Sequence, residues 1–387
     1  MAKFQTDKPH ITFLFSDTGG GHRAASEAII EALHAEFGDA VITEMVDFLK
    51  DYAPEPFNHL PELYPDLVRA PELWGAMFDI SDGRPQARFV TSTFWPYVRR
   101  ALHRLVRDHH SDMLVSVHPI ANSFVLKALG ENHPPFITVV TDLVSTHALW
   151  FDKGADLILV PTEMARENAI HYKMPSEKVR VIGQPVSLRC SAPIGDKASL
   201  RNGLGWPQDK FTVLLVGGGD GMGPLAETAR AIDESGLDVC MVIVAGRNSK
   251  LEAELKEQTW ENKTFVYGFT HDMPDFMRAA DVIVTKAGPG TIAEALIAQL
   301  PIILYAKLPG QEDGNVDFVV SEGAGVWAPE SQVVVRTLTR WVCRPSEREV
   351  VVKACRRAAR PDATKQIALV LAKQVGLTDE PLEVSTG

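Results

Sequence analysis

The stretch Thr285-Lys-Ala-Gly-Pro-Gly-Thr-Ile-Ala-Glu294 joins an apolar run to a helix-forming run, and its pattern decides the fold. The β-branched residues of 281–285 predict a short buried strand, which Gly288-Pro289-Gly290 ends. A helix is expected from Thr291 onward. The free N–H groups of a helix start attract an anion, and glycine lets a ligand approach the backbone. Glu294, one turn into the helix, can accept hydrogen bonds from a ribose diol, so the segment outlines a nucleotide site.

A second glycine-rich turn, Gly217-Gly-Gly-Asp-Gly-Met-Gly223, follows the strand-like run 211–216 and precedes a helical pattern. Its backbone amides can cradle a diphosphate, and the alternative is an ordinary tight turn between strand and helix. The polar loop Pro309-Gly-Gln-Glu-Asp-Gly-Asn315 follows another strand-like run, 302–305. Ligands of open α/β sheets bind at the carboxyl ends of the strands, which is where these turns fall.

A third glycine-rich turn, Ser16-Asp-Thr-Gly-Gly-Gly-His22, joins the strand-like run 11–15 to a helical pattern over 23–33. Its spacing fits neither a Walker loop nor a dinucleotide fingerprint. His22 is a candidate general base, because an imidazole titrates near neutrality, and the alternative is a helix-capping histidine. Asp17 is a candidate to orient His22 or to contact an acceptor, or else it is a turn residue.

A polar cluster follows the strand-like run 136–140. Asp142 comes just after that run, and His147 and Trp150 follow within a turn or two. These side chains are candidates for an acceptor pocket. The alternative is a helix-capping Asp142 and a packed Trp150.

The bulk composition is that of a soluble globular protein large enough for two domains, with 387 residues, 45% of them hydrophobic. The net charge of -11 disfavours a nucleic-acid partner. The four cysteines form no CxxC pair and are typical of buried thiols in a reducing cytosol. We find no signal peptide, no run of ~18 apolar residues and no metal-ligand spacing, so we expect a cytoplasmic protein that touches a membrane only peripherally.

Strand and helix patterns alternate through the first half and restart after a Gly/Pro-containing linker, which predicts an α/β fold of two doubly wound domains. We predict an N-terminal acceptor-binding domain (1–185), a C-terminal donor-binding domain (186–345), and terminal helices and a tail (346–387) that pack back on the N-terminal domain. Residues 51–95, rich in proline and aromatics, are interpreted as an insertion that faces a membrane. The arginines of 97–107 indicate either contact with anionic lipid or a solvated face of a core helix.

Five motifs together resemble the monogalactosyldiacylglycerol synthase family and its bacterial relatives, the diacylglycerol glucosyltransferases. They run in the same order along the chain and comprise Ser16–Ala24, Val140–Asp142, Val181–Val186, Lys286–Glu294 and Leu308–Asn315. A more distant likeness is to the N-acetylglucosaminyltransferase that forms lipid II. The resemblance implies a GT-B fold, in which two Rossmann-like domains face a central cleft.

The resemblance also implies residue roles. Glu294 would hold the ribose hydroxyls of a UDP-sugar, and His22 would be the base or would bind an activating anionic lipid. The other donor-side candidates flank the uracil, face the diphosphate or bind the sugar: Gly217, Gly218, Gly219, Gly221, Phe269, Thr270, Gly288, Gly290, Thr291, Gln311, Glu312 and Asn315. Asp17 is the second catalytic candidate, and the acceptor-side candidates are Gly20, Gly21, Asp142, His147 and Trp150.

The function that this resemblance implies is an inverting transfer of galactose or glucose from UDP-galactose or UDP-glucose to 1,2-diacylglycerol, without an essential metal or other cofactor. Peripheral contact with anionic membrane lipid belongs to the same expectation. Two alternatives remain open from the residues: a GT-B transferase with a polyprenyl-linked or soluble acceptor, and a UDP-sugar epimerase.

Overall fold

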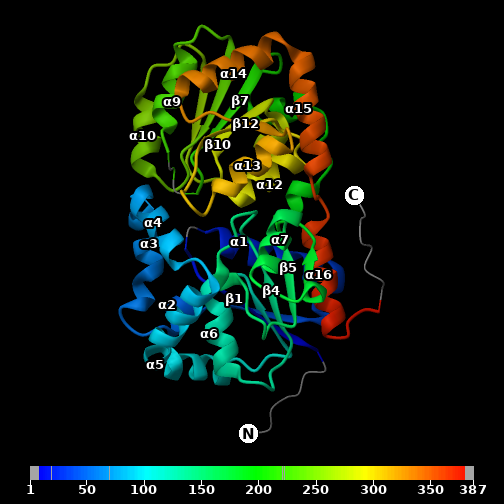
Figure 1. Ribbon diagram of the computed structural model, residues 1–387. Helices are drawn as coiled ribbons and strands as arrows, with labels where there is room; N and C mark the ends of the chain where they lie inside the picture. Colours follow the sequence, from blue (N-terminus) through cyan, green and yellow to red (C-terminus); the bar gives the residue numbers. More distant parts are fainter. Residues whose placement is uncertain (1–7, 19, 69, 220, 222, 380–387) are drawn as a thin grey trace. The chain divides into compact units, whose positions relative to one another are not determined.

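The computed structural model describes residues 8–379 except 19, 69, 220 and 222, so Gly19 of the first glycine turn and residues 380–387 of the predicted tail lie outside the described part (Figure 1). The chain divides into two compact units. The first unit holds residues up to Leu188 and the segment from Asp362, and the second holds Arg189–Pro361.

A six-stranded parallel sheet forms the centre of the first unit, in the order β2-β1-β3-β4-β5-β6. Its strands are short and mostly buried, which matches the continuous apolar runs of the sequence. The strands are β1 (His10–Phe15), β2 (Ile42–Asp47), β3 (Met113–Ser116), β4 (Phe136–Val139), β5 (Leu157–Val160) and β6 (Val179–Val181).

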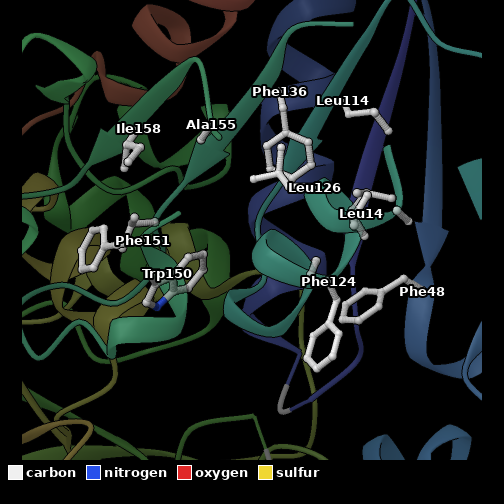
Figure 2. Close-up of a cluster of buried hydrophobic side chains, with 14 of the residues drawn as sticks. Leu14, Phe48, Leu114, Phe124, Leu126, Phe136, Trp150, Phe151, Ala155 and Ile158 are labelled. Carbon is white, nitrogen blue, oxygen red and sulfur yellow. The ribbon is translucent and has the colours of Figure 1, made fainter. Parts of the chain in front are cut away.

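Helices cover both faces of this sheet. They are α1 (Gly21–Phe37), α2 (Phe48–Tyr52), α3 (Leu60–Val68), α4 (Pro71–Ser81), α5 (Arg84–Asp108), α6 (Pro119–Leu129), α7 (Glu163–His171) and α16 (Ala363–Gln374). One face carries α1 and α16, whose apolar residues form a single core with the strands. The other face carries α5, α6 and α7, and Figure 2 shows part of its core, including Phe136, Trp150 and Phe151.

The second unit repeats this architecture with a parallel sheet in the order β12-β11-β10-β7-β8-β9. Its strands are β7 (Phe211–Val216), β8 (Val239–Val244), β9 (Lys263–Tyr267), β10 (Val282–Lys286), β11 (Ile302–Ala306) and β12 (Gly325–Trp327). Its helices are α8 (Lys197–Leu204), α9 (Leu225–Asp233), α10 (Ser249–Glu257), α11 (Met273–Ala279), α12 (Pro289–Ile297), α13 (Asp313–Ser321), α14 (Ser331–Cys343) and α15 (Pro345–Ala358).

Alternate residues of β7 point to opposite faces of the second sheet. Val213 and Leu215 belong to the core that α9 and α14 cover. The residue between them, Leu214, is completely buried on the other face. Two parallel sheets with helices on both faces confirm the predicted α/β, doubly wound fold.

Three segments differ from the sequence expectation. The proline- and aromatic-rich segment 51–95 is largely helical. The helix predicted to begin at Phe94 begins at Arg84, because Pro85 occupies the first turn, where a missing N–H costs nothing, and Pro96 is accommodated inside the helix. The strand predicted over 40–46 begins at Ile42, after a short 3-10 turn over Gly38–Ala40. The predicted terminal segment 346–387 contains helices of both units, since α15 lies in the second unit and α16 in the first.

Candidate active site

In the first unit, α1 begins directly after the turn that follows β1. Gly20 is its N-cap, with φ at 77°, a left-handed conformation that glycine adopts without strain. The turn places His22 on the first turn of the helix, half-buried at the carboxyl end of the sheet. The His22 Nδ1 atom lies 3.0 Å from the Thr141 hydroxyl, and the His22 ring contacts the ring of His118, with 4.6 Å between centroids.

Burial lowers the pKa of His22 to about 4, because taking the imidazolium out of water outweighs the nearby Val117 carbonyl and the Asp17 carboxylate, which both raise it. His22 is therefore neutral at physiological pH. A neutral imidazole has a nitrogen lone pair that can accept a proton from a hydroxyl group, but a pKa of about 4 makes His22 a weaker base than the near-neutral imidazole expected from the sequence.

His118 is a neighbour that the sequence analysis missed. Its Nδ1 accepts the Ile120 N–H at 3.3 Å, so Nε2 carries the proton and donates it toward the Thr18 hydroxyl at 3.1 Å. Burial, and next the proximity of His22, hold the pKa of His118 well below its usual range. The local signal was its place at the end of a strand and just before Pro119, the first residue of α6.

The sequence candidates around His22 are placed as follows. Asp17 lies 3.1 Å from Arg23 in an ion pair, whereas the groups that hydrogen-bond the His22 ring are the Thr141 hydroxyl and the Val117 carbonyl. Trp150 is completely buried in the hydrophobic cluster of Figure 2. Its indole N–H donates to Asp142 at 2.6 Å. These contacts favour packing roles for Asp142 and Trp150 over direct contact with an acceptor.

His147 is also buried, where its Nδ1 accepts the Leu149 N–H at 3.1 Å and its Nε2 lies 3.1 Å from the Ser81 hydroxyl. Burial lowers its pKa. Its observed role is to cap the 3-10 turn η3 (Ala148–Trp150) and to link it to the end of α4. Gly21, by contrast, has open space beside its Cα and leaves the backbone accessible.

In the second unit, α12 begins at the carboxyl end of β10. Gly288 is its N-cap and Pro289 is its first residue. The first helical bond runs from Ile292 N–H to the Gly288 carbonyl, so the amides of Gly290 and Thr291 precede the helical ladder and lack a partner within it. Gly290 has open space beside it, as an amide that meets an anion requires.

Glu294 follows one turn later on α12 and is half-buried. Its Oε1 accepts a hydrogen bond from the Cys190 thiol at a long 3.9 Å. Burial raises the pKa of Glu294 to about 7, and the thiol, which favours the charged form, offsets only part of this shift. A carboxylate that is poorly hydrated and poorly hydrogen-bonded gains most from a ligand that donates two hydroxyl groups.

The polar loop after β11 is held by a carboxylate. Glu312 is buried and makes an ion pair with Lys286, with 2.5 Å between Nζ and Oε1, while its Oε2 accepts the Leu308 N–H at 2.8 Å. Asn315 is also buried, and its amide N–H donates to the Ala287 carbonyl at 2.8 Å. Glu312 and Asn315 thus fix the loop against the turn that precedes α12.

Within the second unit's other glycine-rich turn, Gly218 and Gly221 pack closely on their neighbours. A Cβ at Gly221 would lie 2.3 Å from the Ala245 carbonyl, and a Cβ at Gly218 would lie 2.9 Å from the Lys286 side chain. Both glycines also have positive φ, so an L side chain would be strained there. Gly219 accepts a hydrogen bond from the Arg247 N–H, and Gly217 donates to the Val244 carbonyl.

The remaining donor candidates sit at strand ends of the same sheet. Phe269, after β9, is 53% exposed, with the Arg247 guanidinium 4.8 Å above its ring and the His271 ring in a T-shaped contact at 5.3 Å between centroids. Thr270 accepts the Asp272 N–H. Gln311 lies half-buried beside Glu312. Within the described ranges, no group of three or more His, Cys, Asp or Glu side chains could hold a metal ion.

Two protein-family models match the chain, one in each half. Residues 22–186 match the model of the monogalactosyldiacylglycerol (MGDG) synthase family, and residues 212–367 match that of the glycosyltransferase family 28 C-terminal domain. Monogalactosyldiacylglycerol synthase 2 of Arabidopsis thaliana, a chloroplastic protein, is 35% identical over 370 residues, which cover 92% of this chain and 79% of that protein.

Solved structures show the same fold at low identity. MurG of Acinetobacter baumannii superposes with a TM-score of 0.62 at 16% identity, and the match covers 94% of this chain and 99% of that one. Anabaena HepE, solved with UDP and glucose, gives a TM-score of 0.55 at 16% identity over 94% of this chain and 99% of that one. The fold is therefore of the GT-B type.

Proposed function

Because the chain belongs to the monogalactosyldiacylglycerol synthase family and is a glycosyltransferase, we propose that it transfers galactose from UDP-galactose to the free hydroxyl of 1,2-diacylglycerol with inversion at the anomeric carbon. The observation that carries the proposal is the 35% identity to an Arabidopsis MGDG synthase over 92% of the chain, which includes the residues of both units described above.

The acceptor hydroxyl attacks the anomeric carbon from the face opposite UDP, the bond to the β-phosphate oxygen breaks, and the hydroxyl proton goes to a base. His22 is the proposed base. It is neutral because burial lowers its pKa to about 4, and the Thr141 hydroxyl 3.0 Å away fixes its ring. A base held in one orientation avoids the entropic cost of finding the hydroxyl proton.

The donor is proposed to bind at the carboxyl edge of the second sheet. The amides of Gly290 and Thr291 at the start of α12 would face the diphosphate, and Glu294 would accept both ribose hydroxyls. Phe269 would stack on the uracil ring. Fixed dipoles and charges of the protein would then stabilise the departing UDP without an essential metal.

Peripheral contact with a membrane follows from the acceptor. No helix of the described residues is both long and apolar enough to span a bilayer. Of the thirteen exposed large hydrophobic side chains among the residues whose burial is described, however, seven lie within residues 63–97 of α3, α4 and α5, among them Ile80 at 76% and Phe89 at 70%. Exposed apolar residues together with the arginines of α5 are typical of a surface that inserts into the interface of an anionic membrane.

The test is UDP release from UDP-galactose and from UDP-glucose, each with and without diacylglycerol in anionic-lipid micelles, with the lipid products separated. Diacylglycerol-dependent release from UDP-galactose with a new galactolipid is the expected result. Faster UDP release from UDP-glucose would identify glucose as the transferred sugar. UDP release or epimerisation that is independent of diacylglycerol would overturn the proposed acceptor.

A further inference from the structure

The side chain of Lys286 runs between the two glycine turns of the second unit. Lys286 is the last residue of β10, and its aliphatic stem crosses Gly218, where a Cβ would approach Lys286 Cε to 2.9 Å. Its ammonium group ends beside Gly288, the N-cap of α12, since a Cβ built there would lie 3.3 Å from Nζ. The positive φ of Gly218 and the missing Cβ therefore make room for this lysine.

Among the described residues, the counterion of the ammonium group is Glu312. Glu312 holds it at 2.5 Å, and the two side chains are largely buried, with 18% of Lys286 and 4% of Glu312 exposed. Burying two charges costs more than a hydrophobic pair of similar volume would, so such a pair is weak evidence for stability alone. A buried cation beside a helix N-terminus is, however, the arrangement that would meet an anion with several negative oxygens.

We propose that Lys286 is a catalytic residue that neutralises the diphosphate of the donor, and that Glu312 is its counterion only while the donor is absent. When the donor binds, a β-phosphate oxygen takes the place of Glu312 at the ammonium group. As the bond between the anomeric carbon and that oxygen breaks, Lys286 keeps its proton and stabilises the negative charge that grows on UDP. This inference rests on the proposed function, because it concerns the donor of that reaction.

When Lys286 leaves Glu312 for the diphosphate, Glu312 becomes able to bind the sugar. Its Oε2 is held by the Leu308 N–H at 2.8 Å, so the carboxylate stays in place when Lys286 turns away, and its Oε1 becomes available to a sugar hydroxyl. One ion pair thereby couples diphosphate binding to sugar binding. The buried Asn315 Oδ1, which has no partner in the described part of the chain, lies in the first turn of α13, directly after Glu312, and offers a second acceptor.

The experiment measures binding of uridine, UMP and UDP to the full chain by calorimetry, together with turnover of UDP-galactose. Lys286→Gln should weaken UDP binding by about tenfold and leave uridine binding unchanged, because a hydrogen bond between charged groups is lost. Turnover should fall by about 10²-fold. Glu312→Gln should tighten UDP binding, because it removes the carboxylate that competes with the diphosphate for Lys286.

Lys307 provides the matched control. It follows β11 as Lys286 ends β10, and it pairs with Asp313 at 2.7 Å. Lys307→Gln should leave the ratio of UDP to uridine affinity as in the native protein. If Lys286→Gln leaves a lone buried carboxylate and fails to fold, the double variant K286Q/E312Q replaces the pair by two neutral amides and should still lose the preference for UDP.

Equal weakening of uridine, UMP and UDP by Lys286→Gln, or weaker UDP binding by Glu312→Gln, would overturn the role of Lys286 and leave the proposed function intact. A native protein that fails to bind UDP would instead overturn the donor of the proposed function, and the role of Lys286 with it.

Discussion

The turn after β1 and the turn after β10 have the same order of elements, a parallel strand, a glycine-rich turn and a helix, yet they build opposite electrostatic environments. The first surrounds two imidazoles, His22 and His118, whose pKa values burial lowers, so these two rings are neutral. The second contains a lysine in a buried ion pair and Glu294, whose pKa burial raises to about 7.

The difference shows how one local architecture serves two kinds of chemistry. A strand end and a helix start supply rigid positions and free amides in both units. The side chains next to each turn then determine its chemical role. Neutral imidazoles can take up a proton, whereas fixed charges can hold a charged ligand, so we assign proton transfer to the first turn and donor binding to the second.

The largest expected effect tests the first turn. His22→Ala should lower turnover by about 10²-fold or more, in line with loss of a general base, with little change in the donor KM. Steady-state kinetics with diacylglycerol micelles measure it. His34→Ala, on the same helix but exposed, is the control and should retain native turnover. Near-native turnover of His22→Ala would remove His22 as the base.

The next effect tests the second turn. Glu294→Ala should raise the donor KM by about 10-fold or more while kcat changes little, because the ribose contact is present in both the ground state and the transition state. Donor titrations at saturating diacylglycerol measure it. A loss confined to kcat would place Glu294 in the chemical step instead and break the division between the turns.

The pH dependence sharpens the same comparison. Glu294 must be ionised to accept two hydroxyl groups, so donor affinity should fall as pH drops below about 7, approaching a tenfold loss per pH unit. Calorimetric titration of UDP between pH 5.5 and 8 measures it. Glu294→Gln should flatten the profile, and a native-like slope in that variant would assign the titration to another group.

A smaller effect concerns Thr141, the partner of His22. Thr141→Val keeps the shape but removes the hydroxyl, and turnover should fall about threefold to tenfold, the worth of one hydrogen bond. Asp17→Asn breaks only a partly exposed ion pair with Arg23 and should have less effect. A larger loss from Asp17→Asn than from Thr141→Val would reverse the assignment of the orienting residue.

The smallest expected effect is on the pH dependence of folding stability, which should have opposite signs in the two turns. Depressed histidine pKa values mean that the unfolded chain binds more protons, so the contribution of His22 is lost as pH falls from 6.5 toward 4, and that of His118 is lost in the same direction below 6.5. The raised pKa of Glu294 acts the other way, and its contribution is lost as pH rises from 4.5 through 7. Thermal unfolding midpoints of His118→Asn and Glu294→Gln across this range should show slopes that change in opposite directions.

Much of the fold could be predicted because its signals are local. Buried parallel strands are continuous apolar runs, and the glycine turns follow them directly, so β7 was predicted residue for residue at Phe211–Val216. The start of α5 was placed ten residues late, at Phe94 instead of Arg84, because prolines suggest helix breaks and only the structure shows which of them a helix accommodates.

The site was less predictable because its contacts are not local. His22 and Thr141 are 119 residues apart, and Lys286 and Glu312 are 26 apart. Both partners of each pair stood inside recognised motifs, yet no periodicity tells which side chains of different strand ends meet. Asp17 was a candidate to orient His22 or to contact an acceptor, with a turn residue as the alternative, and the structure pairs it with Arg23.

The return of the chain to its first sheet has a consequence for synthesis on the ribosome. The strands and α1 of the first unit are made early, but α16, whose Ile367 and Leu371 complete the core with Ile29 and Leu33, is made only after the whole second unit. A nascent chain that has reached residue 361 carries an apolar sheet face that α1 covers only in part. Premature termination there should yield an aggregating product, and chaperone demand should peak while the second unit is being translated.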